Sequence, residues 1–546
     1  MTKNLIKPIW RKLSLLPVIA LLVSCGGGDS SLMANLTGQV TAVLSNSNNK
    51  ATHYAASRFL EHASMGATPT SVAQVKTLGI EGWINAQLKL PPTLVIAAPS
   101  LYDYELNVDK PAEQRMWDFL RQSNANLLIG GEDQLRVRTS WVLSNFLVIS
   151  DKKVLPYGIL EYQNMLQNYA LGQYGDLLKA LTRNPAMGSY LDNNQNRRTQ
   201  LNENYGRELM QLFSVGLVQL NLNGTSKRDA NGKLLETYSQ KDVIEITRAL
   251  TGWDSAEPSV KRKSANNMNY GKQMEANWPD QHDTGSKTFL GKTVPAGQDA
   301  YKDLDSLVEI LVTHPNTAPF ISLRLIQGLT TSDPSPAYLE RVATVFRDTK
   351  GNLAKVVTAI LLDAEARSGD APGKSTQTFG RIKEPLLIYT SGFRGLGCKV
   401  APKEPWSPTQ TAQSNTQRQF SAISVFNFYP PNHRTQGTNV LAPEQKMLNS
   451  TEFSSRASYF TRIFRDENLL NDAGCDVSTF KAAKASSDEQ LLDLMNERFF
   501  RGALPATIGK SIIDANKNLW DRNNGLSLVG AYLDMASLTP AFGVSK

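Results

Sequence analysis

Residues 201–217 read Leu-Asn-Glu-Asn-Tyr-Gly-Arg-Glu-Leu-Met-Gln-Leu-Phe-Ser-Val-Gly-Leu. Tyr205, Leu209 and Leu212 recur at helical spacing and make an apolar stripe, whereas polar residues occupy the opposite side. Gly216 suits the position that ends such a helix. The stretch therefore predicts an amphipathic helix that packs one face against a core.

The same helical period recurs along most of the chain. Helices are expected over 113–127, 134–150, 158–171, 202–215, 241–251, 301–313, 317–329, 337–347, 353–362, 450–464, 488–498 and 521–535. Strand-like alternation is scarce, and its best case is Val218–Leu222, which precedes turns at Asn223-Gly224 and Asn231-Gly232. Because no fixed-period repeat occurs, the sequence predicts a mainly α fold: a large single α-helical body with a small β-hairpin insertion near 217–238.

The composition is that of an ordinary globular protein. The 546 residues include 58 Lys and Arg against 50 Asp and Glu, a formal net charge of +8, and 41% are hydrophobic. Three Cys and five His exclude a disulfide-rich scaffold, a four-cysteine zinc site and a histidine-rich centre. The EF-hand spacing fails at both Asn-Gly turns, so we expect no metal site, and the sequence identifies no cofactor.

The N-terminus is typical of bacterial lipoprotein export. Lys and Arg residues precede the apolar run Leu13–Val23, which is shorter than the about 20 residues of a membrane span. Leu22-Val-Ser-Cys25 resembles a lipobox, in which Cys25 becomes the lipidated first residue. We therefore expect a lipoprotein signal peptide at 1–24, a flexible tether at 25–50 and an α-helical domain at 51–546. The alternative is an ordinary secretory signal with an incidental cysteine.

A lipid on Cys25 would attach the protein to a membrane, at about 0.8 kcal/mol for each buried methylene group. Gly26 follows this cysteine, and by resemblance to Gram-negative lipoprotein sorting a residue other than Asp favours the outer membrane. Four cations and no acid lie in the signal peptide, so half of the +8 belongs to the export signal. Because no basic cluster interleaved with aromatic residues follows it, we expect no nucleic-acid partner.

The two remaining cysteines are Cys398 and Cys475. In an oxidising compartment they can form a disulfide, which would stabilise the fold by about 4 kcal/mol because it closes a long loop. The alternative is two separate buried thiols, since sequence spacing does not show that two residues are close.

The first group of candidate catalytic residues lies on the helix quoted above. Glu203 and Arg207 are four residues apart and can pair on one face. Glu208 borders the apolar stripe, where an unpaired carboxylate is costly and its proton affinity is altered. These residues predict either an acid/base site or a buried ion-pair network that fixes helix packing.

The second group follows in the chain. Asp242 and Arg248 recur on the next expected helix, and His282, Asp283 and Lys287 lie in a loop-like segment. The Asp-Thr-Gly-Ser tetrapeptide that begins at Asp283 matches aspartic proteases, but it occurs once and follows no apolar strand, so we reject that interpretation. The segment indicates either an acid/base or ligand-binding pair or a hydrogen-bonded turn.

The motifs in their order resemble one bacterial protein family. They are Asn202–Leu217, Leu250-Thr-Gly-Trp253, His282–Lys287, His314-Pro-Asn316, Arg381-Ile-Lys-Glu-Pro385 and Ser424-Val-Phe-Asn-Phe428, within a span from about Ser57 to Met447. The chain is therefore similar to the family catalogued as domain of unknown function 1800. The resemblance implies an exported, helix-rich protein whose gene neighbours encode a sulfatase-like protein of the domain of unknown function 1501 family; it implies no reaction.

The chain departs from the family pattern at two places. Many relatives carry a Trp-His-x-His-Phe type sequence where this chain has Trp141–Val148, so a mechanism that needs that histidine is in doubt here. Ala442–Gln445 lacks the Phe that usually precedes the Gln.

Two functions follow as hypotheses. The first is an envelope-anchored accessory or binding protein that acts with the sulfatase-like partner on an extracellular polymer such as a polysaccharide. The second is a hydrolase or lyase for an anionic extracellular substrate, with Glu208 or Asp283 as base, His282 as acid/base or ligand, and Arg207, Arg248 and Lys287 stabilising the anion. Glu203 and Asp242 complete this candidate set.

Overall fold

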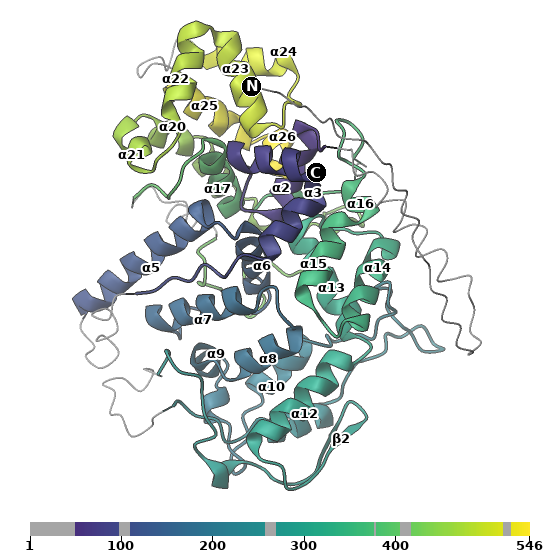
Figure 1. Cartoon of the computed structure of the whole chain (residues 1–546). Coiled ribbons are helices and arrows are strands. Elements are labelled where there is room, and N and C mark those ends of the chain that lie inside the picture. The colour runs from purple at the N-terminus through teal and green to yellow at the C-terminus, as the bar shows by residue number, and fades with distance from the viewer. Residues whose placement is uncertain (1–49, 98–109, 257–268, 376–377, 404–416, 517–525) are drawn as a thin grey trace, which may run out of the picture. The chain divides into compact units, whose positions relative to one another are not determined.

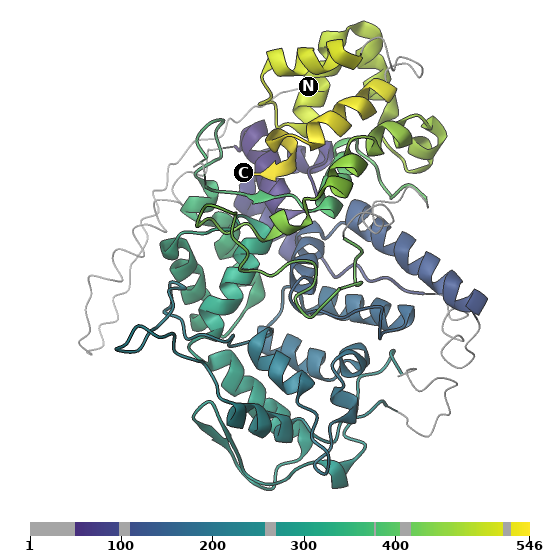
Figure 2. The same cartoon turned by 180° about the vertical axis from the view of Figure 1, so that it is seen from behind.

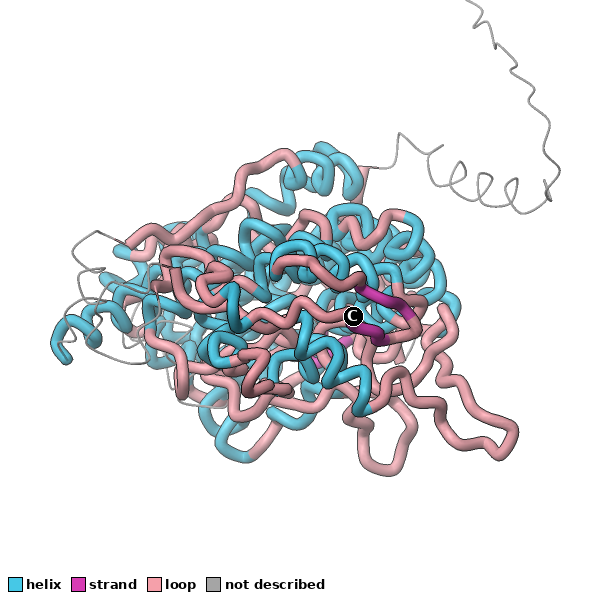
Figure 3. The backbone as a smooth tube through the Cα atoms, turned by 90° about the horizontal axis from the view of Figure 1, so that it is seen from below, coloured by secondary structure: helices cyan, strands magenta, loops and turns pink. Residues whose placement is uncertain are grey.

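Helices make up most of the structure, as the helical period predicts, so the mainly α fold is confirmed (Figure 3). The computed structural model describes residues 50–97, 110–256, 269–375, 378–403, 417–516 and 526–546. The expected signal peptide, Cys25 and all of the expected tether except Lys50 lie outside these residues. In the described part of the chain, no helix combines the length and the hydropathy needed to cross a bilayer.

The N-terminal half of the described chain is built from helices, with one short two-stranded sheet. Its helices are α2 (His53–Ala63), α3 (Pro69–Leu88), α5 (Lys110–Gly130), α6 (Gln134–Ser144), α7 (Pro156–Tyr169), α8 (Tyr174–Thr182), α9 (Pro185–Tyr190), η2 (Asn193–Gln195), α10 (Asn204–Gln211), α11 (Gln240–Ala249) and η3 (Pro279–Gln281). Strands β1 (Lys287–Phe289) and β2 (Lys292–Val294) follow.

The C-terminal half continues the same pattern. Its elements are α12 (Ala300–Thr313), α13 (Thr317–Leu329), α14 (Pro336–Asp348), α15 (Leu353–Leu362), α16 (Ala364–Arg367), β3 (Arg381–Ile382), α17 (Pro385–Gly395), η4 (Pro443–Met447), α19 (Ser450–Arg456), α20 (Tyr459–Phe464), α21 (Glu467–Asp472), α22 (Val477–Ser486), α23 (Asp488–Phe499), α24 (Ala506–Asn516), α25 (Leu526–Ser537), α26 (Pro540–Gly543) and β4 (Val544–Ser545).

Segments from distant parts of the chain lie side by side in this fold. Strand β4 pairs antiparallel with β3 and contacts α2, and Figures 1 and 2 show the C-terminus next to α2 from both sides. The backbone N–H of Lys383 also donates to the carbonyl of Gly543 over 2.8 Å. The segment that carries Arg381 is therefore held by the C-terminal residues.

The hairpin region near 217–238 forms two successive hydrogen-bonded turns. Val218 bridges Glu236, and the N–H of Gln219 donates to the carbonyl of Leu235 over 2.9 Å. The turns are at Gly224 and Gly232, whose φ angles of +82° and +80° are typical of glycine. The small β-hairpin is thus confirmed, and it consists of isolated bridges rather than long strands.

The side chain of Asn316, just before α13, fixes this hairpin to the helical body. Its Nδ2 donates to the carbonyls of Val215 and Val218 over 2.6 and 2.9 Å, and its Oδ1 accepts the N–H of Leu220 over 2.6 Å. Helix α10 ends at Gln211, before the expected end at 215. The chain then turns toward the hairpin at Gly216, which has φ +70°.

Two further expected helices differ from the prediction, one by ending early and one by being divided. Helix α6 ends at Ser144 rather than at 150, because Ser150 pairs with Ser421 and the N–H of Asp151 donates to the carbonyl of Phe420 over 2.8 Å. The expected helix over 450–464 is divided into α19 and α20 at Ser458, which has φ −147°.

Helices α6 and α13 approach each other closely at Gly328. A Cβ atom at this position would lie 2.2 Å from Cγ1 of Val142, so only glycine fits here. The close contact brings the C-terminal ends of both helices together, next to the loop 425–431.

Candidate functional site

Glu203 and Arg207 form the ion pair that their spacing predicts. Nη2 of Arg207 donates to Oε2 of Glu203 over 2.7 Å, and Nε2 of Gln240 donates to the same oxygen over 2.9 Å. Both charged side chains are about one-third exposed, at 40% for Arg207 and 33% for Glu203. This contact links α10 to the start of α11. Because the ion pair is partly exposed, it contributes little to the free energy of unfolding.

Glu208 stands apart from this pair. Its Oε2 atom is buried and has no hydrogen-bond partner among the described residues. Burial raises the pKa of Glu208, and Arg207 offsets this only in part. Tyr238, whose pKa burial raises to about 12, and Tyr190 lie close enough to feel its charge. Glu208 is therefore a half-buried carboxylate with acid/base character.

Arg248 connects two acidic residues in what we call the Arg248 cluster, formed by Glu245, Arg248 and Asp283. Its Nε and Nη2 donate to the two carboxylate oxygens of Asp283 over 2.7 and 3.1 Å, and its Nη1 donates to both oxygens of Glu245 over 2.9 Å. The bonds from Arg248 lower the pKa of Asp283, although burial opposes the charge. The pKa of Arg248 is raised, chiefly by Asp283. The three side chains use their charged atoms on one another, which suits a structural role, and the cluster keeps a formal net charge of −1.

His282 and Lys287 meet at Asp303, which lies on α12. The Nζ of Lys287 bonds to Oδ2 of Asp303 and to the carbonyl of Asp283, and both side chains of the Lys287–Asp303 pair are fully buried. Nε2 of His282 lies 3.1 Å from the same Oδ2, and its Nδ1 lies 2.9 Å from the carbonyl of Thr251. The three side chains join β1 and the preceding loop to α12.

Asp242 is held as a helix cap. Its Oδ2 accepts the N–H and the hydroxyl of Ser239 over 2.7 and 2.6 Å, and its Oδ1 accepts the N–H of Leu290 over 2.8 Å. Burial acts to raise its pKa, but these hydrogen bonds outweigh it and lower the pKa. Both carboxylate oxygens thus accept hydrogen bonds from backbone N–H groups.

The structure brings together Arg248, His282, Asp283 and Lys287, and it places Glu203 and Arg207 in a separate pair. Asp242 contacts the turn between β1 and β2, and Glu208 lies close enough to Arg207, Tyr190 and Tyr238 for their charges to interact. Within the described ranges, no group of three or more His, Cys, Asp and Glu side chains could hold a metal ion.

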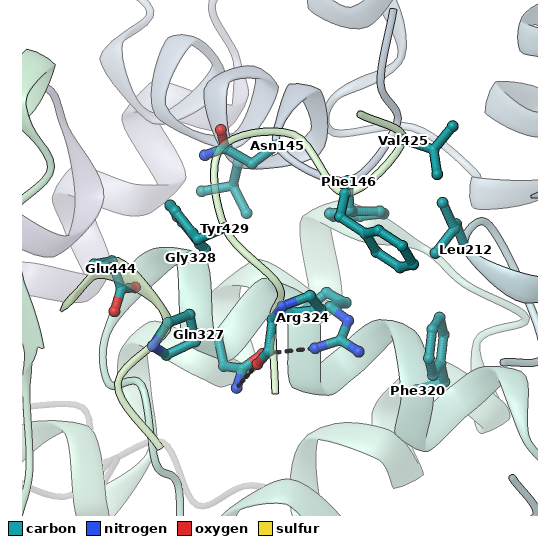
Figure 4. Close-up of a pocket in the computed structure, with 14 residues that line it drawn as sticks. Asn145, Phe146, Leu212, Phe320, Arg324, Gln327, Gly328, Val425, Tyr429 and Glu444 are labelled. Carbon is teal, nitrogen blue, oxygen red and sulfur yellow. Dashed lines mark hydrogen bonds between the residues drawn. The ribbon is translucent and has the colours of Figure 1, made fainter. Parts of the chain in front are cut away.

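A pocket of about 70 Å³ lies beside the close contact of α6 and α13 (Figure 4). We call it the Arg324 pocket. It is lined by Val142, Asn145, Phe146, Leu212, Phe320, Arg324, Gln327, Gly328, Val425, Phe426, Tyr429, Pro431, Pro443 and Glu444. Most of these side chains are apolar, so a few polar groups determine what the pocket can hold.

A buried charged network lies behind this pocket and shares Tyr429 and Glu444 with its wall. Arg381 pairs with Glu384 and, over 2.9 Å, with Glu444. Glu384 also accepts hydrogen bonds from the hydroxyl of Tyr429 over 3.0 Å and from Nε1 of Trp141 over 3.2 Å. We call Arg381, Glu384 and Glu444 the Arg381 network.

Arg381 and Glu384 favour each other's charged forms despite their burial. Burial opposes the charge of Arg381, but Glu444 and Glu384 outweigh it and raise the pKa of Arg381. Burial acts to raise the pKa of Glu384, but Arg381 outweighs this effect and lowers the pKa. Arg138 lies close enough to contribute, and burial together with Arg381 lowers the pKa of Arg138 to about 9.

Sequence reasoning did not find Asp303, Arg324 or the Arg381 network as site residues. Arg324 had a visible signal, since it is the one charged residue in the otherwise apolar and polar-neutral segment 317–329. Arg381 and Glu384 lie within a motif that carries the family resemblance, but the motif itself does not show their burial. Asp303 had no signal, because it occupies an ordinary position near the start of a helix.

Comparison with known proteins gives one match. A model of the family described as "Protein of unknown function (DUF1800)" matches residues 58–542. No curated protein and no solved structure matches this chain.

Proposed function

The chain belongs to the DUF1800 family, and from this premise we propose that it is a lipid-anchored binding protein of the bacterial envelope. It captures part of an extracellular polymer such as a polysaccharide and acts beside a sulfatase-like partner of the domain of unknown function 1501 family. The observation that favours binding over catalysis is that contacts within the protein occupy most of the predicted catalytic side chains. Arg248, Asp283 and Lys287 use their polar atoms on one another, on Glu245 and Asp303 and on the backbone, and Nδ1 of His282 lies 2.9 Å from the carbonyl of Thr251.

The proposed location rests on the sequence and on one structural feature. The lipobox at Cys25, the polar tether after it and Gly26 support an outer-membrane lipoprotein of a Gram-negative bacterium. Cys398 and Cys475 form a disulfide, which supports an oxidising compartment.

Replacement of Cys25 by alanine is expected to release the protein from membranes, because the acyl chains supply the membrane affinity. The measurement is the distribution of full-length protein between detergent and aqueous phases and between membrane and soluble cell fractions. Ser24→Gly, which leaves the cysteine in a lipobox, is the matched control. A C25A protein that stays in the detergent phase with mature size would contradict the lipid anchor.

The binding function is tested with the mature chain and two kinds of target. We expect retention on at least one immobilised anionic polysaccharide, or co-purification with the product of the neighbouring sulfatase-like gene. Heat-denatured protein is the control for nonspecific adsorption. If the folded chain binds neither kind of target, the proposed function is wrong.

A hydrolase or lyase acting on an anionic extracellular substrate is the second candidate, and Glu208 favours it. Its carboxylate has an oxygen with no partner among the described residues and a raised pKa, which are properties of a general acid or base. The neighbouring cation Arg207 would face the substrate anion.

Glu208→Gln separates the two candidates. A folded-state pKa above the unfolded value means that ionisation of Glu208 costs stability as the pH rises through that range, so the Gln variant should melt at the same or a higher temperature at pH 7 to 8. Glu309→Gln, which removes one partner of the exposed ion pair with Lys350, is the control. For an enzyme, we expect E208Q to lose activity by about 100-fold or more while E309Q keeps it. Equal activity of wild type and E208Q would remove Glu208 from the mechanism.

A further inference from the structure

Arg324 is a charged side chain in the wall of the Arg324 pocket that has only neutral partners. Its Nη1 donates to Oε1 of Gln327 over 3.0 Å, and its Cζ lies 5.0 Å from the centre of the Phe320 ring. Among the described residues no carboxylate lies within ion-pair distance of it. Burial lowers its pKa to about 10, so the guanidinium remains charged at neutral pH.

Gln327 holds the guanidinium in place. Its Nε2 donates to the carbonyl of Ser332 over 3.1 Å and to that of Pro431 over 3.4 Å, which turns its carbonyl oxygen toward Arg324. Figure 4 shows this bond and the guanidinium between Gln327 on one side and Phe320 on the other. A guanidinium has five N–H donors, so donors remain for a ligand.

Several other buried arginines of the described chain have their charge or their donors taken up, whereas Arg138 keeps unpartnered Nε and Nη1 atoms but is not among the residues that line the pocket. Arg58 pairs with Asp370 over 2.8 Å, and Arg381 pairs with two glutamates. Arg394 has no acidic partner, but it donates to the carbonyls of Gly66 and Ile129 and is buried at 4% exposure. Arg324 differs because it lines a pocket and keeps partial access to solvent.

The rest of the pocket wall indicates which chemical groups a ligand needs. Phe146, Leu212, Phe320 and Val425 supply apolar surface around the guanidinium (Figure 4). The second charged group of the wall, Glu444, is already used by Arg381 and by the hydroxyl of Ser332. The pocket therefore combines one available cation with apolar and aromatic walls.

We propose that the Arg324 pocket is an anion-binding subsite that takes a carboxylate, sulfate or phosphate group carried on a ring. The anion receives hydrogen bonds from the guanidinium, and the ring packs against Phe146 and Phe320. This inference deepens the proposed binding function, on which it rests, by naming the chemical class of the ligand.

Titration calorimetry of the mature, disulfide-bonded chain in low-salt buffer tests the subsite. The probes are benzoate, phenyl sulfate and phenyl phosphate, with benzyl alcohol as the neutral analogue, so the affinities identify the preferred anion. We expect at least one anion to bind at least tenfold more tightly than benzyl alcohol, because a charge-assisted hydrogen bond in an apolar site has that effect.

Arg324→Gln is expected to weaken binding of that anion at least tenfold and to leave the melting temperature unchanged or higher, because it removes a buried charge without an acidic partner. Arg324→Lys keeps the charge and should bind with intermediate affinity. Arg347→Gln, an exposed arginine of α14, is the matched control and should bind as the wild type does.

The outcomes separate this inference from the proposed function. Anion binding that depends on Arg324, in a chain that retains neither polysaccharide nor partner, would support the subsite and overturn the binding function. Equal affinity for benzoate, phenyl sulfate, phenyl phosphate and benzyl alcohol, or an R324Q chain that binds as tightly as the wild type, would overturn the subsite. If R324Q does not fold, the affinities of the wild type for the anions and for benzyl alcohol still test the subsite.

Discussion

Replacement of Arg381 by methionine is expected to lower the free energy of unfolding by about 3 to 5 kcal/mol. The change leaves Glu384 and Glu444 in the interior without their shared cation, and both carboxylates are buried at 1% and 2% exposure. Burying a carboxylate without a cation costs far more free energy than an exposed ion pair contributes to stability. Urea unfolding at pH 7, followed by circular dichroism, measures the loss.

The cause of this loss can be checked by neutralising the acids as well. The triple variant with Arg381→Met, Glu384→Gln and Glu444→Gln should regain part of the stability, because it leaves neither carboxylate charged in the interior without Arg381. The difference between wild type and R381M should also shrink as the pH falls, because a carboxylate that binds a proton no longer needs the charge of Arg381. Glu203→Gln, in an exposed pair, should cost less than about 1 kcal/mol. A loss below 1 kcal/mol for R381M would mean that the network does not hold the fold.

Loss of the disulfide is expected to lower the free energy of unfolding by about 4.5 kcal/mol, on the chain-entropy model for a loop of this length. Cys398 and Cys475 are 77 positions apart, and the bond joins the end of α17 to the turn between α21 and α22. The double variant Cys398→Ser/Cys475→Ser should therefore unfold at much lower urea concentration than the wild type. Addition of a reductant to the wild type should reproduce the change.

A matched control distinguishes the bond from the side chains. Reductant should have no effect on the double-serine variant, since it has no bond left to break in this part of the chain. An unchanged unfolding midpoint of the wild type in reductant would show that the disulfide contributes nothing to stability.

Most helices could be predicted because each carries its own period. Residues 317–329 and 353–362 were predicted with the bounds that α13 and α15 have. The β1–β2 hairpin was not predicted, since its strands are three residues long and show no alternation. Its turn uses Leu290 and Gly291 at φ +50° and +70°, and Leu is not a residue that signals such a turn.

The candidate site was harder to predict because its contacts connect distant parts of the sequence. Helical spacing predicted the pair Glu203–Arg207. It could not show that Arg248 reaches Asp283, 35 positions away, or that Arg381 reaches Glu444, 63 positions away. Such contacts depend on tertiary packing, which no local pattern contains.

The pairing of β3 with β4, and the contact of β4 with α2, also constrain how the protein is made. Near the same place Nε2 of His53 contacts the carbonyl of Glu497, a residue 444 positions later. Contacts at such separation form late, because a long loop must close before they contribute. A nascent chain therefore cannot complete this core until residue 545 has emerged from the ribosome, so helix α2, made early, stays without part of its final packing while the residues between them are synthesised.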